Sequence, residues 1–470
     1  MSDVPAYLRL GLYSSFTKYT RYLFTLRSVS QPSKYHTLLL FRLSPKECRS
    51  DLQPPVSQSD QLFVMESSCP HLGADLSHAE IEEWGDESMV AVCPWHRYDF
   101  DLRTGKSETG LRACTYSVKV LDSDTSGTAQ IWVESPGEGG WDIVEIRPVS
   151  EDFADPPSAI SRNPVENSNI TSSSSVAISE EAEPTTLFEW AVLILNTPNP
   201  ELKVKRTRDA VLAFRTGKLR SVGRGVKNKP VPPDVPPREK DLNFVAPGKV
   251  TRRGNGGSLK SRIIILHALA NIEQWAWDII ARFGDEKVAG QALPHQFFSD
   301  WVKVAEDESK HFSLLRRRLQ ELGSFYGEHT VHAGLWESAR DTAHSLPARL
   351  CIIHLVHEAR GLDVNPTTIA KFRAAGDQES VRVLEIIHHD EITHVTAGHR
   401  WFTWICEALA LDPIHEFREN VRKYFNGLIR GPFNESDRRL AGMTPDYYLD
   451  LRGEGGVLDH KKEGPVTYNI

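Results

Sequence analysis

Two short segments that each combine one cysteine with one histidine place the strongest constraint on how this chain folds. Residues 69–73 read CPHLG and residues 93–96 read CPWH. Proline and glycine favour the tight loops that would let both side chains of each segment point toward one metal centre. The fold must therefore bring two loops that are separated along the chain together around a bound metal.

The ligand types distinguish between two kinds of metal centre. A Rieske [2Fe–2S] cluster takes two cysteines on one iron and two histidines on the other. A Cys2His2 zinc site is the alternative, but zinc fingers usually pair cysteine with cysteine and histidine with histidine. Residues 35–150 resemble the Rieske domain of bacterial-type ferredoxins and ring-hydroxylating oxygenases, including the stretch WHRYDFD at 95–101 and the Thr-Gly pair at 104–105.

This resemblance implies that Cys69 and Cys93 bind one iron and that His71 and His96 bind the other. High-potential respiratory members carry a disulfide between the two ligand loops, whereas no cysteine of this sequence stands where that bridge needs one. We therefore expect the lower-potential type of Rieske domain, which transfers electrons between redox partners.

A second pattern, Asp-Glu-x-x-His, occurs at residues 307–311 and again at residues 390–394. Glutamate and histidine three residues apart lie on one face of a helix, so each repeat can offer one oxygen and one nitrogen to the same metal site. The leading aspartate is placed to accept a hydrogen bond from an imidazole N–H, either in its own helix or across the bundle.

Each repeat is preceded at a similar distance by another glutamate, Glu273 before the first and Glu358 before the second. This repetition indicates two helix hairpins related by a pseudo-twofold axis. Two glutamates and two Glu-x-x-His motifs form the di-iron site of ferritin-like bundles, and four buried carboxylates would require bound cations. The candidate iron ligands, which are also the candidate catalytic residues, are Glu273, Glu308, His311, Glu358, Glu391 and His394.

The C-terminal half resembles a ferritin-like family of uncharacterised function. The matching segments are residues 267–273, 307–311, 357–363, 385–394 and 398–402. That family is distantly similar to a di-iron enzyme that hydroxylates a modified base in tRNA. The resemblance implies a four-helix bundle that binds two iron ions, and it leaves the substrate open.

Two further histidines allow other interpretations. Glu391, His394 and His399 match the carboxylate and two histidines of a mononuclear non-haem iron site. However, His394 and His399 would lie roughly 140° apart around a continuous helix. His354 shares a helix face with Glu358, either as a packed core residue, as a further ligand or as a hydrogen-bond donor to a ligand.

Composition and periodicity divide the chain into segments. Short apolar runs between Gly, Pro and Asp indicate small antiparallel sheets. After Leu187, apolar residues at three- and four-residue spacing predict four long helices, at residues 258–283, 294–323, 347–375 and 378–411. We predict an N-terminal extension (1–34), a Rieske domain (35–150), a flexible linker rich in Ser, Pro and acidic residues (151–186), a ferritin-like helical domain (187–440) and a C-terminal tail (441–470). The expected fold class is multidomain, with a small all-β domain and an all-α four-helix bundle.

Composition also bounds the partners and the location. The six cysteines are spread over the chain and form no disulfide framework, which favours a reducing compartment. No run approaches the ~18 apolar residues of a membrane span, and the net charge of −8 disfavours nucleic acid. We expect a cytoplasmic protein without membrane contact. A mitochondrial presequence is the alternative, because Met1–Leu40 is rich in Ser, Tyr and Arg.

A Rieske cluster moves one electron at a time, whereas a di-iron site that activates O2 needs two electrons per turnover. We therefore predict an enzyme, an oxygen-dependent oxidoreductase in which the cluster supplies electrons to a di-iron site that oxidises a small-molecule substrate, as a hydroxylase or as a desaturase-like oxidase. The sequence has no Gly-x-Gly-x-x-Gly fingerprint, so the expected electron donor is an NAD(P)H-dependent reductase or a ferredoxin. The alternatives are a ferritin-like iron oxidase, a redox or oxygen sensor, and a tRNA-modifying hydroxylase.

We also expect the tethered Rieske domain to dock with its His71/His96 edge close to the di-iron helices.

Overall fold

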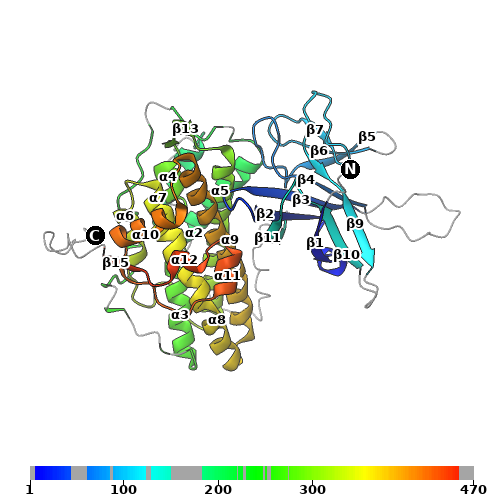
Figure 1. Ribbon diagram of the computed structural model, residues 1–470. Helices are drawn as coiled ribbons and strands as arrows, with labels where there is room; N and C mark the ends of the chain where they lie inside the picture. Colours follow the sequence, from blue (N-terminus) through cyan, green and yellow to red (C-terminus); the bar gives the residue numbers. More distant parts are fainter. Residues whose placement is uncertain are drawn as a thin grey trace, which may run out of the picture.

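The computed structural model describes residues 6–43, 61–84, 88–122, 129–149, 183–219, 221–225, 229–246, 249–250, 254, 256–273 and 275–454. An all-β part and a largely helical part pack side by side (Figure 1). The predicted fold class, a small all-β domain joined to a helical domain, is therefore confirmed. Most of the predicted linker, residues 151–182, lies outside the described residues.

The largest sheet of the β domain has five strands and separates two hydrophobic cores. Its strands in spatial order are β11 (Trp141–Pro148), β2 (Arg21–Ser28), β3 (Tyr35–Leu43), β4 (Gln61–Glu66) and β8 (Thr115–Tyr116). Because successive side chains of a strand point to opposite faces, Leu38 and Leu40 enter one core while Leu39 and Phe41 enter the other. The second core also holds Cys69 and Cys93, so this sheet forms the floor beneath the two ligand loops.

Two smaller sheets complete the β domain. One consists of β1 (Tyr7–Leu12), β10 (Ala129–Glu134) and β9 (Val118–Asp122), and the other of β5 (Glu80–Trp84), β6 (Ser88–Val92) and β7 (Asp99–Asp101). A short 3-10 helix, η1 (Tyr13–Phe16), follows β1. Residues 7–28, which belong to the predicted N-terminal extension, thus supply β1 and β2 to the sheets.

Four long helical segments form the centre of the helical domain. They are α3 (Leu259–Ile272), α5 (His295–Glu321), the continuous pair η3 (Leu350–Glu358) and α8 (Ala359–Ala374), and α9 (Gln378–Ala408). Ser258 and Asp377 cap the N-termini of α3 and α9 by accepting hydrogen bonds from main-chain N–H groups. Among the described residues, no helix combines the length and the apolar character needed to cross a membrane.

Two of these segments differ from the helices that periodicity predicts. The stretch 258–283 is not one helix, because α3 ends at Ile272 and a turn at Glu273 leads into α4 (Asp278–Phe283). The stretch 347–375 contains a π-helical segment, η3, which ends at Glu358. π-Helical turns are frequent at functional sites, and here the irregularity falls on a candidate iron ligand.

Shorter elements surround the four segments. They are α1 (Leu187–Leu195), α2 (Pro200–Arg215), β12 (Lys287–Val288), β13 (Gln291–Ala292), α6 (Gly334–Asp341), α7 (Leu346–Arg349), α10 (Pro413–Tyr424), β14 (Asn426–Leu428), α11 (Glu435–Leu440), α12 (Pro445–Tyr448) and β15 (Arg452–Glu454). Although α12 and β15 lie in the predicted C-terminal tail, both pack against α10.

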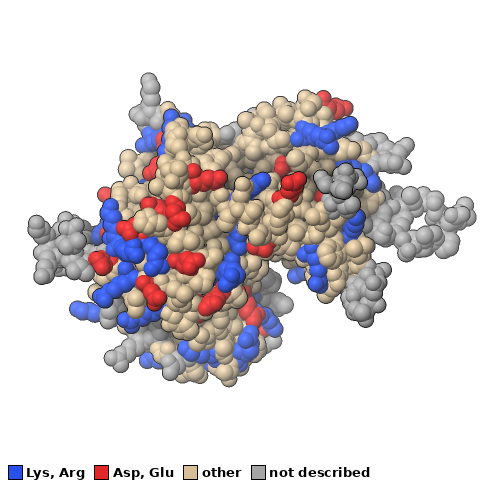
Figure 2. All heavy atoms as spheres, in the orientation of Figure 1, with Lys and Arg blue, Asp and Glu red and all other residues tan. Residues whose placement is uncertain are grey.

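On the face shown in Figure 2, basic and acidic side chains alternate over the helical domain, without a continuous basic track among the described residues.

Candidate redox sites

The two Cys/His loops converge at one end of the β domain. Cys69 and Cys93 are buried, and the rings of His71 and His96 lie 4.9 Å apart between centroids. His71 is exposed and His96 is half-buried, so the imidazoles lie on the outer side of the thiols. The structure therefore brings together all four side chains that the sequence predicts as cluster ligands.

Both loops use the same backbone geometry. The main-chain N–H of Gly73 donates to the carbonyl oxygen of Cys69 at 2.8 Å, and that of Arg97 donates to Cys93 at 2.9 Å. Gly73 and Arg97, the fifth residues of the two loops, have positive φ angles of 77° and 56°. The two loops therefore turn at the same position after the cysteine, although the histidine follows its cysteine by two residues in the first loop and by three in the second.

The electrostatics of the loops suit thiolate ligands. The hydrogen bond between the two thiols lowers the pKa of Cys93 to about 6 and raises the pKa of Cys69, to which burial also contributes. Main-chain amides of residues 71 and 72 point at Cys69, and those of residues 95 and 96 point at Cys93; both pairs lower the thiol pKa. Amides directed at sulfur stabilise the negative charge of a bound iron–sulfur cluster.

The second constellation is a buried group of carboxylates and imidazoles at the centre of the helices. Glu273, Glu308, His311 and Glu391 each offer one ligand atom, and these atoms all lie within 4.8 Å of one another. Glu273 stands at the C-terminus of α3, Glu308 and His311 on α5, and Glu391 on α9. Three helices that are distant in sequence thus direct potential metal ligands at one point.

The other two candidate ligands lie beside this group. Nδ1 of His394 is 3.3 Å from Oε1 of Glu308 and 3.7 Å from Oε2 of Glu391. Burial raises the pKa of both Glu273 and Glu391, and the negative charge of Glu358 adds to this rise. Glu358 also pairs with Nδ1 of His354 at 2.8 Å. His354 therefore contacts the candidate ligand Glu358, which agrees with the predicted role of a hydrogen-bond donor to a ligand.

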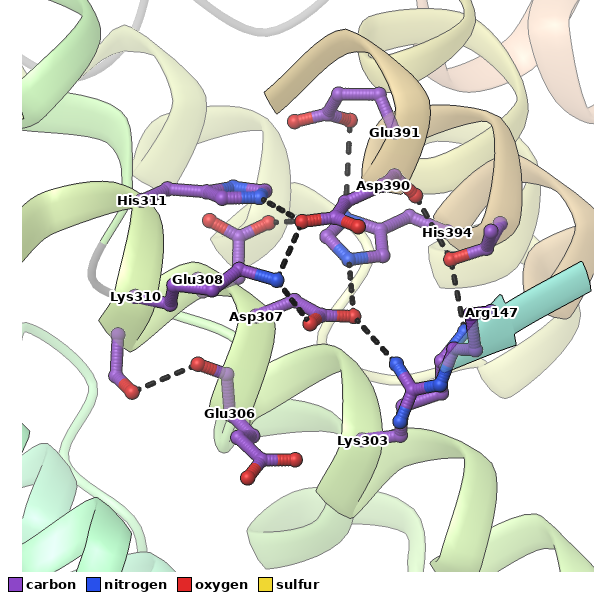
Figure 3. A network of polar contacts seen from close by, with 12 residues as sticks. Arg147, Lys303, Glu306, Asp307, Glu308, Lys310, His311, Asp390, Glu391 and His394 are labelled. Atoms are coloured by element: carbon purple, nitrogen blue, oxygen red, sulfur yellow. Dashed lines mark hydrogen bonds and ion pairs between the residues drawn. The ribbon is translucent and has the colours of Figure 1, made fainter. Parts of the chain in front are cut away.

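Each aspartate of the repeated motif contacts the histidine of the other repeat. Oδ2 of Asp390 lies 3.0 Å from Nε2 of His311, and Oδ2 of Asp307 lies 3.5 Å from Nε2 of His394 (Figure 3). Lys310 joins both aspartates, at 2.8 Å from Asp307 and 2.6 Å from Asp390. Both imidazoles consequently direct Nδ1 toward the carboxylate group, which is the orientation that a metal site requires.

Several buried polar atoms of the group lack a hydrogen bond. Oε2 of Glu391 and both ring nitrogens of His394 make none with good geometry among the described residues. Burial and the neighbouring carboxylates raise the pKa of Glu273 and Glu391 well above the usual value, although His394 opposes the rise at Glu391. Unsatisfied buried donors and acceptors are costly. The donor set of glutamates and imidazoles therefore fits bound metal ions better than an empty core.

His399 lies away from this group. Its Nδ1 faces the hydroxyl of Tyr35 at 3.0 Å and its Nε2 faces the hydroxyl of Tyr447 at 3.3 Å. Burial lowers the pKa of His399 to about 3, so the ring is neutral. This environment contradicts the mononuclear site of Glu391, His394 and His399, because both ring nitrogens of His399 already have tyrosine partners.

Sequence reasoning missed the residues that the β domain contributes near these carboxylates. Arg147 of β11 lies 3.5 Å from Asp307, and Glu145 of β11 lies 2.6 Å from Lys303 of α5. Neither Arg147 nor Glu145 belongs to a motif, and only the packing of the two domains reveals them. Only Lys303 could have been found from the sequence, because it lies two turns before His311 on α5 and therefore on the same helix face.

These two sites define the class of this protein: a two-domain redox protein with a Rieske domain and a helical domain that contains a buried carboxylate–histidine group. Residues 39–118 match the family described as Rieske [2Fe-2S] domain, and residues 196–449 match the one described as Protein of unknown function (DUF455). The chain belongs to the DUF455 family. The Rieske match establishes an iron–sulfur domain with an electron-transfer role.

Two individual proteins resemble parts of the chain. An uncharacterized protein of Haemophilus influenzae is 36% identical over 224 residues, which cover 45% of this chain and 77% of that protein. A solved structure assigned as the small subunit of an NADH-dependent nitrite reductase from Mycobacterium tuberculosis is 15% identical. It covers 29% of this chain and 100% of its own, with a TM-score of 0.21.

Proposed function

We propose that this protein is an oxygen-dependent oxidoreductase in which the Rieske cluster passes electrons to a di-iron site in the helical domain. The observation that carries the proposal is the convergence of Glu273, Glu308, His311 and Glu391, whose ligand atoms lie within 4.8 Å of one another in a buried setting. Glu358 and His394 would complete the set of six ligands that ferritin-like di-iron proteins use.

The surrounding residues prepare such a site. Asp307 and Asp390 orient the two imidazoles from the other side, and Lys310 compensates the charge of both aspartates. Burial of the carboxylates excludes bulk water, which strengthens every electrostatic interaction in the site. When bound, two ferrous ions would supply the capacity to reduce O2 and oxidise a substrate.

The contact between the domains supports electron delivery from the cluster. The ring of Trp95, in the second ligand loop, lies 4.7 Å from that of His295, the first residue of α5. From His295 to Glu308 the helix rises roughly 20 Å. The same helix therefore contacts the cluster loop at its start and carries Glu308 and His311 further along. Exposed His71 and Leu72 would form the contact for an external reductase or ferredoxin.

Iron analysis and O2 consumption test this proposal. Purified full-length protein, loaded anaerobically with Fe(II), should contain about four irons and two acid-labile sulfides per chain. With NADH and a reductase, a substrate of the enzyme should accelerate O2 consumption over many turnovers. Consumption that stops once the added Fe(II) is oxidised would instead indicate an iron oxidase, and no iron beyond the cluster would refute the di-iron site.

Substrate candidates would come from comparing the small molecules and modified tRNA bases of a deletion strain with those of its parent. A compound that accumulates only in the deletion strain is then tested for turnover with the purified protein. A change confined to a tRNA base would favour the tRNA-modifying alternative, whereas unchanged pools of both kinds would favour a sensor.

A further inference from the structure

Asp307 and Asp390, which contact His394 and His311, differ in the cationic side chains that neutralise their charge. Asp390 contacts Lys310 and His311, which both belong to the helical domain. Asp307 contacts Lys310 and His394 and, in addition, Nη1 of Arg147 at 3.5 Å. Arg147 belongs to β11 of the Rieske domain, so a residue from the other domain contacts the aspartate of one half of the candidate metal site.

Two ion pairs of opposite polarity cross the domain boundary at this point. Arg147 of the Rieske domain pairs with Asp307 of α5 (Figure 3). Lys303 of α5 pairs with Glu145 of the Rieske domain at 2.6 Å. Lys303 also donates to the hydroxyl of Thr393 on α9 at 2.9 Å. The side chains of Glu145 and Asp307 are 7% and 4% exposed. Ion pairs at this depth are little screened by salt, and removal of one partner leaves a buried charge.

The contact is not enclosed by tight packing. Arg147, Lys303 and Asp307 line a cavity of about 180 Å³ between the domains, together with Glu145 and Lys310. A cavity of this size holds several water molecules. A shortened side chain at position 147 can therefore be replaced by water, so its substitution need not disrupt the fold.

We propose that Arg147 is a positioning residue for the metal site, holding Asp307 against His394 so that docking of the Rieske domain completes the site. The inference rests on the proposed di-iron function and deepens it. A carboxylate that accepts the N–H of a metal-bound histidine fixes the orientation and the basicity of that ring, and its loss lowers metal affinity 10- to 100-fold. The His394 half of the site therefore depends on docking, whereas the His311 half does not.

The test compares Arg147→Gln with Arg147→Lys and with a matched control in the full chain. Arg27 is suited as the control because it also crosses the boundary, donating to the carbonyl oxygens of Leu440 and Arg439 without contacting the metal site. Each protein, with a natural-abundance cluster, is loaded with 57Fe(II) and dialysed against a chelator. Retained iron per acid-labile sulfide, the Mössbauer spectrum and the EPR signal of the reduced cluster are then measured.

Arg147→Gln should lose the added iron about tenfold more readily and change one of two iron quadrupole doublets. Arg147→Lys should restore both, and Arg27→Gln should match the wild type, with the cluster EPR signal unchanged in all four proteins. Wild-type retention and spectra in Arg147→Gln, or the same loss in Arg27→Gln, would overturn the inference while leaving the proposed function standing. Absence of retained iron in the wild type would overturn both.

Should Arg147→Gln fail to fold, Asp307→Asn removes the same ion pair from the other side. It should weaken iron retention at least as much as Arg147→Gln is expected to, because it also removes the negative charge that faces the imidazole of His394. Full retention of iron in Asp307→Asn would overturn the inference.

Discussion

The indole N–H of Trp95 donates a hydrogen bond to the main-chain carbonyl oxygen of Phe214 at 3.3 Å. This bond joins the second cluster loop to the end of α2 in the helical domain. The rings of Phe214 and His295 stack at 5.2 Å, and the Trp95 ring meets that of His295 edge-on. The loop that carries His96 is thus anchored on two helices, and the cluster site is fixed to the helical domain by direct contact.

Gly217→Ala should loosen this anchor. A Cβ atom at position 217 would lie 2.4 Å from Cδ1 of Trp95 and 2.9 Å from its Cα, so the cluster loop would have to move. We expect slower reoxidation of the reduced Rieske cluster by O2 in stopped-flow measurements. Gly225→Ala is the control, since it has the same φ of +73° and open space around its Cβ. Equal rates in the two variants would show that the loop contact has no role in electron transfer.

His71→Cys should change the cluster without unfolding the domain. The imidazole of His71 is exposed and rests beside Tyr98 at 4.8 Å, so little packing is lost. A cysteine in place of one histidine lowers the reduction potential of a Rieske-type cluster. We expect an EPR spectrum shifted toward the all-cysteine type, or loss of iron and sulfide. Zinc in place of iron and sulfide in the wild-type protein would contradict the cluster assignment.

Glu308→Ala and His394→Ala should each lower the iron content of the helical domain and abolish O2-dependent turnover. Each removes one candidate ligand but little hydrophobic contact, so the helix content measured by circular dichroism should be retained. Glu385→Ala is the control, because this glutamate lies on α9 and pairs with Arg373 at an exposed position. Full iron occupancy and activity in both site variants would refute the six-ligand set.

Lys203→Met should stabilise the protein. Lys203 of α2 is 5% exposed, and its Nζ has no hydrogen-bond partner among the described residues. Burial, together with the charge of Arg238, lowers its pKa to about 7. Its Nζ lies 5.1 Å from the centre of the Trp275 ring. Replacing a buried ammonium that has this ring contact but no hydrogen bond with an apolar side chain of similar length should raise the free energy of unfolding by about 1–3 kcal/mol near pH 7.

The stabilisation by Lys203→Met should depend on pH in a defined direction. In the wild type, the folded state releases the proton above about pH 7, whereas the unfolded state keeps it up to the ordinary pKa of 10.5. Wild-type stability should therefore rise with pH across this interval. The difference in unfolding midpoint between variant and wild type should shrink from pH 7 to pH 9.5. A constant difference would show that Lys203 does not titrate in this range.

Local sequence patterns indicated the candidate ligands and the class of each domain. Cysteine and histidine at fixed short spacing predict a cluster loop whatever surrounds it, because the chain between them is too short to separate the side chains. Glutamate and histidine three residues apart share a helix face for the same reason. The four cluster residues and the two Glu-x-x-His motifs could therefore be identified without any knowledge of tertiary contacts.

The tertiary structure decided how these local units meet. The end of α3 beside Glu273 and the π-helical segment that ends at Glu358 arise from packing, because helix periodicity alone favours continuous helices through both positions. The exchange of partners, with Asp307 facing His394 and Asp390 facing His311, depends on the distance between α5 and α9. The approach of Arg147 to Asp307 depends on how the surfaces of the two domains fit together. Such a fit involves residues from many parts of the chain, so no short sequence motif predicts it.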